Sequence, residues 1–187
     1  MLKQQAVGDR IRRLRTDAGL SLRALASRTD FSPSFISQVE NGLVSPSINS
    51  MQKIAEALGV TLAEFFAAAA GGEGGNIVRA AERPKLDSSW SRGAAEALAT
   101  TNGSEGLTPL LITLDAGGRS GKHPSPSGRA EFAFVIAGEV RLTLGPETHT
   151  LHVGDAVMIV PRELRVWVNE GTASAQILVV SVSAVRS

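Results

Sequence analysis

The chain has 187 residues, and 19 Lys and Arg against 18 Asp and Glu leave a formal net charge of +1. It contains no cysteine, which excludes disulfide scaffolds, thiolate nucleophiles, iron–sulfur clusters and Cys-ligated zinc. No apolar run approaches the ~18 residues that a membrane span needs, and the amino-terminal residues lack the apolar stretch of a signal peptide. The sequence therefore predicts a cytoplasmic protein that has no membrane partner.

Basic residues gather at the amino-terminal end of the chain. The first 28 residues hold seven Lys and Arg against two Asp and Glu, a local charge of +5. A positive field of this kind attracts a polyanion. A solvated helix face would show the same excess, so charge alone leaves both interpretations open.

The composition changes abruptly at residues 67–76, AAAAGGEGGN. The four glycines at positions 71–75 favour a linker, since glycine loses the most backbone freedom when it is ordered. Before this run apolar residues recur every three or four positions, and after it the period falls towards two. We therefore predict an α+β protein of two domains, with a first domain at 1–68, a linker at 69–76 and a second domain at 77–187.

Five short helices are predicted in the first domain. Apolar residues at helical spacing predict a first helix from about residue 4 to 18: Val7, Ile11, Leu14 and Ala18. The other four begin at residues suited to a helix start: Ser21, Ser32 with Pro33, the run 45–47, and Thr61. The third is expected to run to about Val39, the fourth to end at Gly59 and the fifth to reach about Ala68.

Residues 21–42, SLRALASRTDFSPSFISQVENG, predict two short helices joined by a tight turn. Their expected buried set is Leu22, Leu25, Ala26, Phe31, Ile36 and Val39. Together with the following fourth helix, the segment resembles the lambda-repressor-like (XRE family) helix-turn-helix over residues 5–66. Asp30 stands where that family usually has glycine, and Asp tolerates the left-handed backbone that the turn requires. The resemblance implies an all-α, five-helix bundle whose third helix enters the major groove of DNA.

The same resemblance assigns contacts on the third helix. Ser34 and Gln38 fall at base-reading positions, and a glutamine can pair bidentately with adenine. Phosphate contacts are expected from Arg23, Ser32, Ser37 and Asn41. Glu40 has a structural role in the family, as the partner of an arginine on the first helix, here Arg15. For any one of these residues, ordinary solvated polarity is the alternative.

The second domain has the period of β-strands. Strands separated by Gly, Pro, Asn and Asp are predicted within 77–86, 107–116, 131–145, 148–161, 165–171 and 175–185. Residues 88–106 are ambiguous, because GAAEALATT has helical propensity while its neighbours favour a strand. Six or more short strands at such spacing predict a sandwich or a small barrel.

Two partial motifs resemble the cupin family. The first runs from Gly118 through His123-Pro124-Ser125 to Glu131 and Gly138, and the second is GDAVMIVPRELRVWVN at 154–169. The resemblance implies an all-β cupin domain, a jelly-roll barrel. In metal-binding cupins the first motif supplies two histidines and a glutamate, and the second motif supplies one histidine.

This metal set is incomplete in the present sequence. His123 and Glu131 match, but the second histidine position falls near Ser125 and the fourth falls on Arg165. Arginine offers no lone pair to a metal. We therefore expect no metal and no other cofactor.

The same residues define a candidate effector pocket, formed by His123, Ser125, Glu131, Arg165 and Trp167. One hypothesis makes Arg165 an anion receptor inside the barrel, with Trp167 on the same wall. A second makes His123 a loop residue and pairs Glu131 with Arg165 or Arg129. In a third, Arg165 is a plain surface residue.

Together the two halves resemble bacterial regulators that join an XRE-type helix-turn-helix to a cupin sensor. The resemblance implies a sequence-specific DNA-binding transcriptional regulator, a homodimer on double-stranded DNA, with a small, possibly anionic, effector and no enzymatic activity. Two alternatives stay open. One is a metal-dependent cupin enzyme resembling hydroxypropylphosphonate epoxidase, and the other is an antitoxin-like repressor whose barrel only dimerises.

Overall fold

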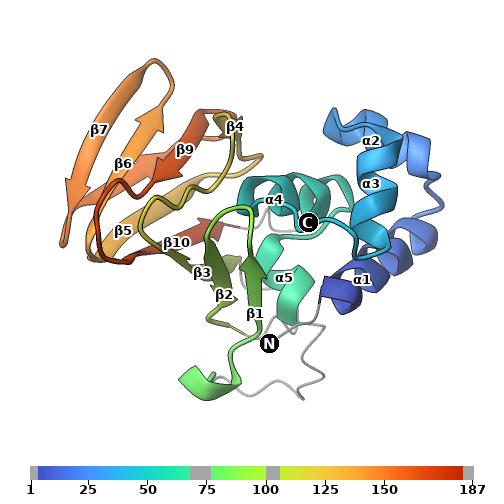
Figure 1. The fold of residues 1–187 in the computed structure, drawn as a ribbon, viewed down its shortest axis with the longest axis horizontal. Coiled ribbons are helices and arrows are strands. Elements are labelled where there is room, and N and C mark those ends of the chain that lie inside the picture. Colours follow the sequence, from blue (N-terminus) through green and yellow to red (C-terminus); the bar gives the residue numbers. More distant parts are fainter. Residues whose placement is uncertain (1–3, 68–76, 100–105, 183–187) are drawn as a thin grey trace.

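The computed structural model describes residues 4–67, 77–99 and 106–182, so the predicted linker at 69–76 lies outside the described residues. Five helices come first (Figure 1): α1 (Gln4–Asp17), α2 (Leu22–Thr29), α3 (Pro33–Glu40), α4 (Ile48–Ala57) and α5 (Leu62–Ala67). None of the described helices combines the length and the apolar character needed to cross a bilayer.

The helices begin where their capping residues predict. The hydroxyl oxygens of Ser21, Ser32 and Ser47 each accept a hydrogen bond of 3.1 Å from a backbone N–H in the first turn of α2, α3 and α4. The turn between α2 and α3 is closed by Asp30 at φ 52° and ψ 28°, the left-handed conformation expected from the sequence. Local chemistry therefore sets the boundaries of the helical domain.

The second domain is a sandwich of antiparallel strands preceded by a short 3-10 helix, η1 (Ala80–Glu82). One sheet has the order β1-β2-β3-β10-β5-β8 and the other β4-β9-β6-β7. The strands are β1 (Lys85–Ser88), β2 (Gly93–Ala97), β3 (Leu107–Leu114), β4 (Ser125–Pro126), β5 (Glu131–Ala137), β6 (Glu139–Leu144), β7 (Glu147–His152), β8 (Ala156–Ile159), β9 (Leu164–Val168) and β10 (Ala175–Val182).

Two segments show how tertiary contacts decide strand formation. The predicted strand at 77–86 is wrong over most of its length, because residues 79–82 are exposed and only 85–88 pair with a neighbour. The ambiguous region contains β2, which pairs with β1 on one side and β3 on the other. Two ladders outweigh its helical propensity.

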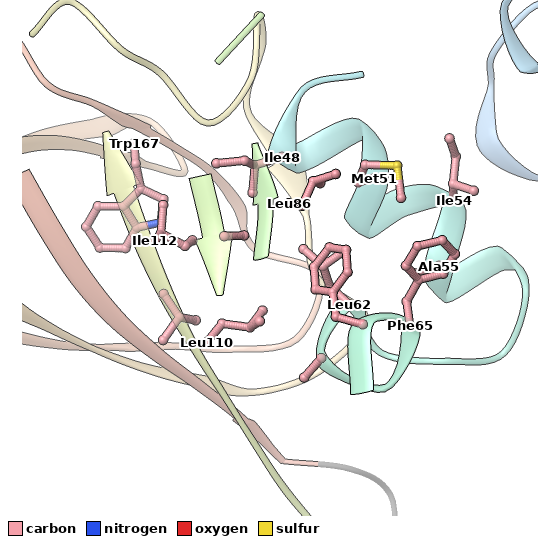
Figure 2. Packing of buried hydrophobic residues seen from close by; sticks show 14 of the residues in the cluster. Ile48, Met51, Ile54, Ala55, Leu62, Phe65, Leu86, Leu110, Ile112 and Trp167 are labelled. Atoms are coloured by element: carbon pink, nitrogen blue, oxygen red, sulfur yellow. The ribbon is translucent and has the colours of Figure 1, made fainter. Parts of the chain in front are cut away.

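The two domains share one hydrophobic core. In Figure 1, α4 and α5 lie between the strands and the bundle of α1, α2 and α3. Ile48, Leu62 and Phe65 on these two helices belong to the same buried cluster as Leu86 and Leu110 of the sheet, as Figure 2 shows. Burying each large apolar side chain contributes about 1.5–3 kcal/mol. The helical domain is therefore docked on the barrel.

Candidate DNA-reading helix and barrel pocket

The exposed face of α3 carries the two predicted base-reading residues. Ser34 and Gln38 lie four residues apart, and both are exposed, while Ile36 and Val39 are buried against the bundle. Within the described part of the chain, the side chains of Ser34, Gln38 and the exposed Arg23 form no hydrogen bond. The polar groups of this face are available to a partner.

A buried ion pair holds the end of α3 against α1. Arg15 donates to Glu40 twice, at 2.6 Å from Nε and 2.9 Å from Nη2, and its Nη1 donates to the carbonyl of Leu20 at 2.8 Å. Hydrogen bonding to Glu40 raises the pKa of the Arg15 guanidinium above its ordinary value, so this group stays positively charged throughout the physiological range. This contact is the one that the XRE-family resemblance implied.

The other predicted phosphate contacts hydrogen-bond within the domain. The Ser32 hydroxyl caps α3. The Asn41 amide accepts from Arg12 Nη2 at 2.7 Å and donates to the carbonyl of Ser37 at 2.8 Å. These three residues therefore shape the two ends of α3, and Ser34 and Gln38 lie between them.

In the barrel, the structure brings Glu131 and Arg165 together. Glu131 is the first residue of β5, and Arg165 lies on β9. The guanidinium donates from Nε to Oε2 at 2.6 Å and from Nη2 to Oε1 at 2.8 Å, and both side chains are almost fully buried. Ser125 is paired opposite Arg165 in the β4·β9 ladder. Arg165 is thus no surface residue, and its charge is balanced by Glu131.

The remaining two predicted pocket residues lie elsewhere. Trp167 is 1% exposed and belongs to the hydrophobic core, and His123 is exposed in the loop before β4. Neither Trp167 nor His123 lines the cavity of about 20 Å³ that lies beside Glu131 and Arg165. That volume holds about one water molecule. This cavity is therefore too small for a metabolite in this arrangement.

The side chain that covers the Glu131–Arg165 pair comes from the helical domain. On α4, Gln52 Nε2 donates to Glu131 Oε1 at 3.1 Å, and Gln52 Oε1 accepts from Arg165 Nη2 at 3.0 Å. Sequence reasoning missed Gln52. A half-buried polar residue one turn after Ile48 looks like any solvent-facing position of an amphipathic helix, so the sequence offers no signal for it.

The start of α4 is also bound to the barrel. The first N–H groups of a helix have no partner within it. Here the N–H of Ile48 donates to Ser91 Oγ at 3.1 Å, and the N–H of Asn49 donates to the carbonyl of Ser120 at 2.8 Å. The Ser88 hydroxyl donates to the carbonyl of Pro46 at 2.7 Å. Barrel groups thus satisfy backbone groups at the start of α4.

These residues do not fit a divalent metal. Both oxygens of Glu131 accept hydrogen bonds from Arg165, and the guanidinium fills the space that a histidine ligand would need. Residues 4–67, 77–99 and 106–182 hold no group of three or more His, Asp or Glu placed to bind a metal ion. A cation here would have to displace a buried positive charge.

Comparison with known proteins agrees with both halves of the fold. A helix-turn-helix family model matches residues 11–65, and a cupin domain model matches residues 110–181. The HTH-type transcriptional regulator PuuR of Escherichia coli is 30% identical over 156 residues, which cover 82% of each chain. The chain belongs to this family of helix-turn-helix transcriptional regulators. It is a DNA-binding regulator of the XRE type with a cupin domain.

Solved structures show the same two-domain fold. A transcriptional regulator of the HTH_3 family from Vibrio cholerae superposes with a TM-score of 0.75 at 22% identity, covering 97% of both chains. Hydroxypropylphosphonic acid epoxidase from S. wedmorenis superposes with a TM-score of 0.50 at 22% identity, covering 96% of this chain and 98% of its own. The likeness to the epoxidase is one of fold.

Proposed function

We propose that this regulator acts as a homodimer whose two α3 helices read paired half-sites, while the barrel senses a small molecule without catalysing a reaction. The observation that carries the proposal is the exposed Ser34–Gln38 face of α3. Both ends of that helix are fixed, by the Ser32 cap and by the Arg15–Glu40 pair. A rigid helix with free polar groups can hold base edges at a defined register.

The dimer supplies what one small domain lacks. Its few base-reading groups give limited affinity, whereas two linked copies gain through effective concentration. They also fix half-sites about one duplex turn apart, roughly 34 Å. The association constant is expected to fall by about 0.9 log units per tenfold rise in salt for each phosphate neutralised. The total salt dependence should be modest, because few phosphates are contacted.

The outer face of the larger sheet is the dimer surface in this proposal. Phe132 of β5 stands opposite Met158 of β8 and Val180 of β10, so the three form one apolar strip across the ladders. Met158 is 65% exposed and Phe132 38%. Contiguous apolar surface on a barrel is typical of an interface between subunits. Because the strip lies across three adjacent strands, it suits a second copy of the same face.

The ion pair in the barrel supports sensing over catalysis. Glu131 and Arg165 neutralise each other. Among the described residues, no group of three or more His, Asp or Glu is placed to bind a metal ion with them. A general acid or base needs a proton that it can exchange with a substrate. A buried, bidentate pair offers binding geometry instead.

The test of DNA reading starts with genome-wide footprinting, which supplies the operator. Gln38→Ala is then expected to weaken operator binding by about 1–3 kcal/mol and to leave binding to unrelated DNA unchanged. Gln176→Ala removes a carboxamide from the barrel and serves as the matched control. Equal loss on both DNAs would show that Gln38 grips the backbone and does not read a base.

The dimer is tested in the same preparations. Met158→Glu places a charge in the apolar strip, and it is expected to convert a dimer into a monomer in sedimentation experiments. Operator binding should fall with it, because the paired half-sites lose their linkage. A dimer that persists in Met158→Glu would assign dimerisation to another surface.

A further inference from the structure

A side chain of the helical domain, Gln52 of α4, contacts both partners of the buried pair in the barrel. The Gln52 carboxamide donates from Nε2 to Glu131 and accepts at Oε1 from Arg165, so it meets both partners of the buried pair. The same Nε2 also donates to Glu56 Oε1 on α4 at 3.2 Å. Glu131 Oε1 accepts a hydrogen bond from the amide nitrogen, and Arg165 Nη2 donates one to the amide oxygen. A free primary carboxamide would make the same two bonds.

We infer that the Glu131–Arg165 pair is a carboxamide-recognition site, that Gln52 occupies it as a built-in ligand, and that a larger effector with this group displaces Gln52 and undocks α4. The inference deepens the proposed function, and it rests on the sensing role assigned there. It names both the chemical class of the effector and the contact through which its binding reaches the helical domain.

Charge complementarity sets the preference for a neutral carboxamide. A carboxylate in the place of Gln52 would meet Arg165 with one oxygen and would oppose Glu131 Oε1 with the other. An ammonium would suit Glu131 and would oppose Arg165. Glu56 is a second carboxylate that accepts from Gln52 Nε2, and Arg129 in the cavity lining offsets its formal charge. A group with a donor beside an acceptor fits both halves of the pair.

Space makes docking and effector binding exclusive. The cavity of about 20 Å³ cannot take a molecule larger than water while Gln52 is in place. An effector larger than the Gln52 side chain must therefore move α4. The N–H groups of Ile48 and Asn49 then leave Ser91 and Ser120, and the attached α3 changes its position relative to the barrel. In a dimer this changes the spacing of the two reading helices.

The experiment uses the full chain with Gln52→Ala, which removes the part of the side chain that acetamide replaces. Acetamide is titrated in thermal unfolding, with Gln176→Ala as the matched loss of a carboxamide and acetate as the charged ligand of equal size. We expect acetamide to raise the Tm of Gln52→Ala saturably, to leave wild type and Gln176→Ala unshifted, and to exceed acetate. Equal shifts in all three chains, no shift in Gln52→Ala, or a preference for acetate would overturn the inference.

Amide hydrogen exchange at Ile48 and Asn49 tests the displacement of α4. Both amides are expected to exchange faster in Gln52→Ala than in wild type and to slow again when acetamide is added. If Gln52→Ala does not fold, Gln52→Met fills the volume without hydrogen bonds and should show the same fast exchange. Protection equal to that of wild type in either variant contradicts the inference.

Operator binding separates the two proposals. Gln52→Ala is assayed on the footprinted operator with and without acetamide. Acetamide rescue of Tm and exchange in a chain that binds no operator would refute the proposed function and keep the carboxamide site. Operator binding that is intact, with no response of Tm or exchange to acetamide, would keep the function and refute the site.

Discussion

Each domain contains a buried glutamate held by an arginine, and the two pairs differ in what they connect. In the helical domain, Glu40 accepts from Arg15 at 2.6 and 2.9 Å, and α1 and α3 are joined within one bundle. In the barrel, Glu131 accepts from Arg165 at 2.6 and 2.8 Å, and a third side chain, Gln52, arrives from the other domain. The same chemistry therefore fixes the end of α3 in one place and joins two domains in the other.

The degree of burial also separates the pairs. The Arg15 side chain is 11% exposed, whereas that of Arg165 is 4% exposed. Loss of either arginine leaves a buried glutamate, since Glu40 is 2% and Glu131 1% exposed, but Glu40 keeps Arg12 at 3.5 Å as a second cation. Loss of the arginine should consequently lower the free energy of unfolding more in the barrel pair than in the helical pair.

The largest expected effect follows from breaking the barrel pair. Arg165→Met leaves the carboxylate of Glu131 buried without its partner, and it should lower the free energy of unfolding by about 3–5 kcal/mol. Urea denaturation followed by circular dichroism measures the loss. The matched control is Arg141→Met, which removes the exposed Arg141–Glu170 pair and should leave the urea midpoint unchanged. Similar losses in both variants would contradict the assigned role of burial.

A smaller loss is expected in the helical domain. Arg15→Met removes the hydrogen bonds to Glu40, and the domain should lose about 1.5–3 kcal/mol, a typical value for hydrogen bonds to a charged group. Arg12 lies 3.5 Å from the same carboxylate and keeps part of its charge balanced. Operator affinity should fall too, because the end of α3 is released. Unchanged operator binding in this variant would show that the pair does not position the reading helix.

The smallest expected change tests the contact between the domains. A Cβ on Gly121 would lie 2.6 Å from Nδ2 of Asn49 and 2.9 Å from its Cβ, so Gly121→Ala presses on the start of α4. We expect a loss of about 1 kcal/mol, at the low end for an overpacked site, because the Asn49 side chain can shift. Faster amide exchange at Ile48 and Asn49 would locate the effect. Loss of stability without that exchange would place the strain inside the barrel.

The helical domain was predictable because its determinants are local. Ser21, Ser32 and Ser47 cap helices within three residues of their own positions, and Asp30 takes its left-handed conformation within one turn. The exposed positions of Ser34 and Gln38 follow from the same short periodicity. Short-range hydrogen bonds and helical spacing are written in neighbouring residues, so a single sequence suffices to locate them.

The barrel pocket was predictable only in part. The cupin resemblance located Ser125, Glu131 and Arg165, which the structure places together. It also assigned His123 and Trp167 to the pocket, but His123 is exposed in a loop and Trp167 is buried in the core. Where a loop side chain points depends on packing, and the spacing of a motif does not specify it.

Residue patterns along the chain were enough to predict the two domains, the helix starts and the exposed positions of Ser34 and Gln38 on α3. Tertiary structure alone decided that residues 93–97 form a strand, that residues 79–82 do not, and that Gln52 enters the barrel. The bond from Arg165 to Gln52 joins residues 113 positions apart. Local propensity acts over a few residues, whereas the partner of a buried charge is chosen by the packing of the whole chain.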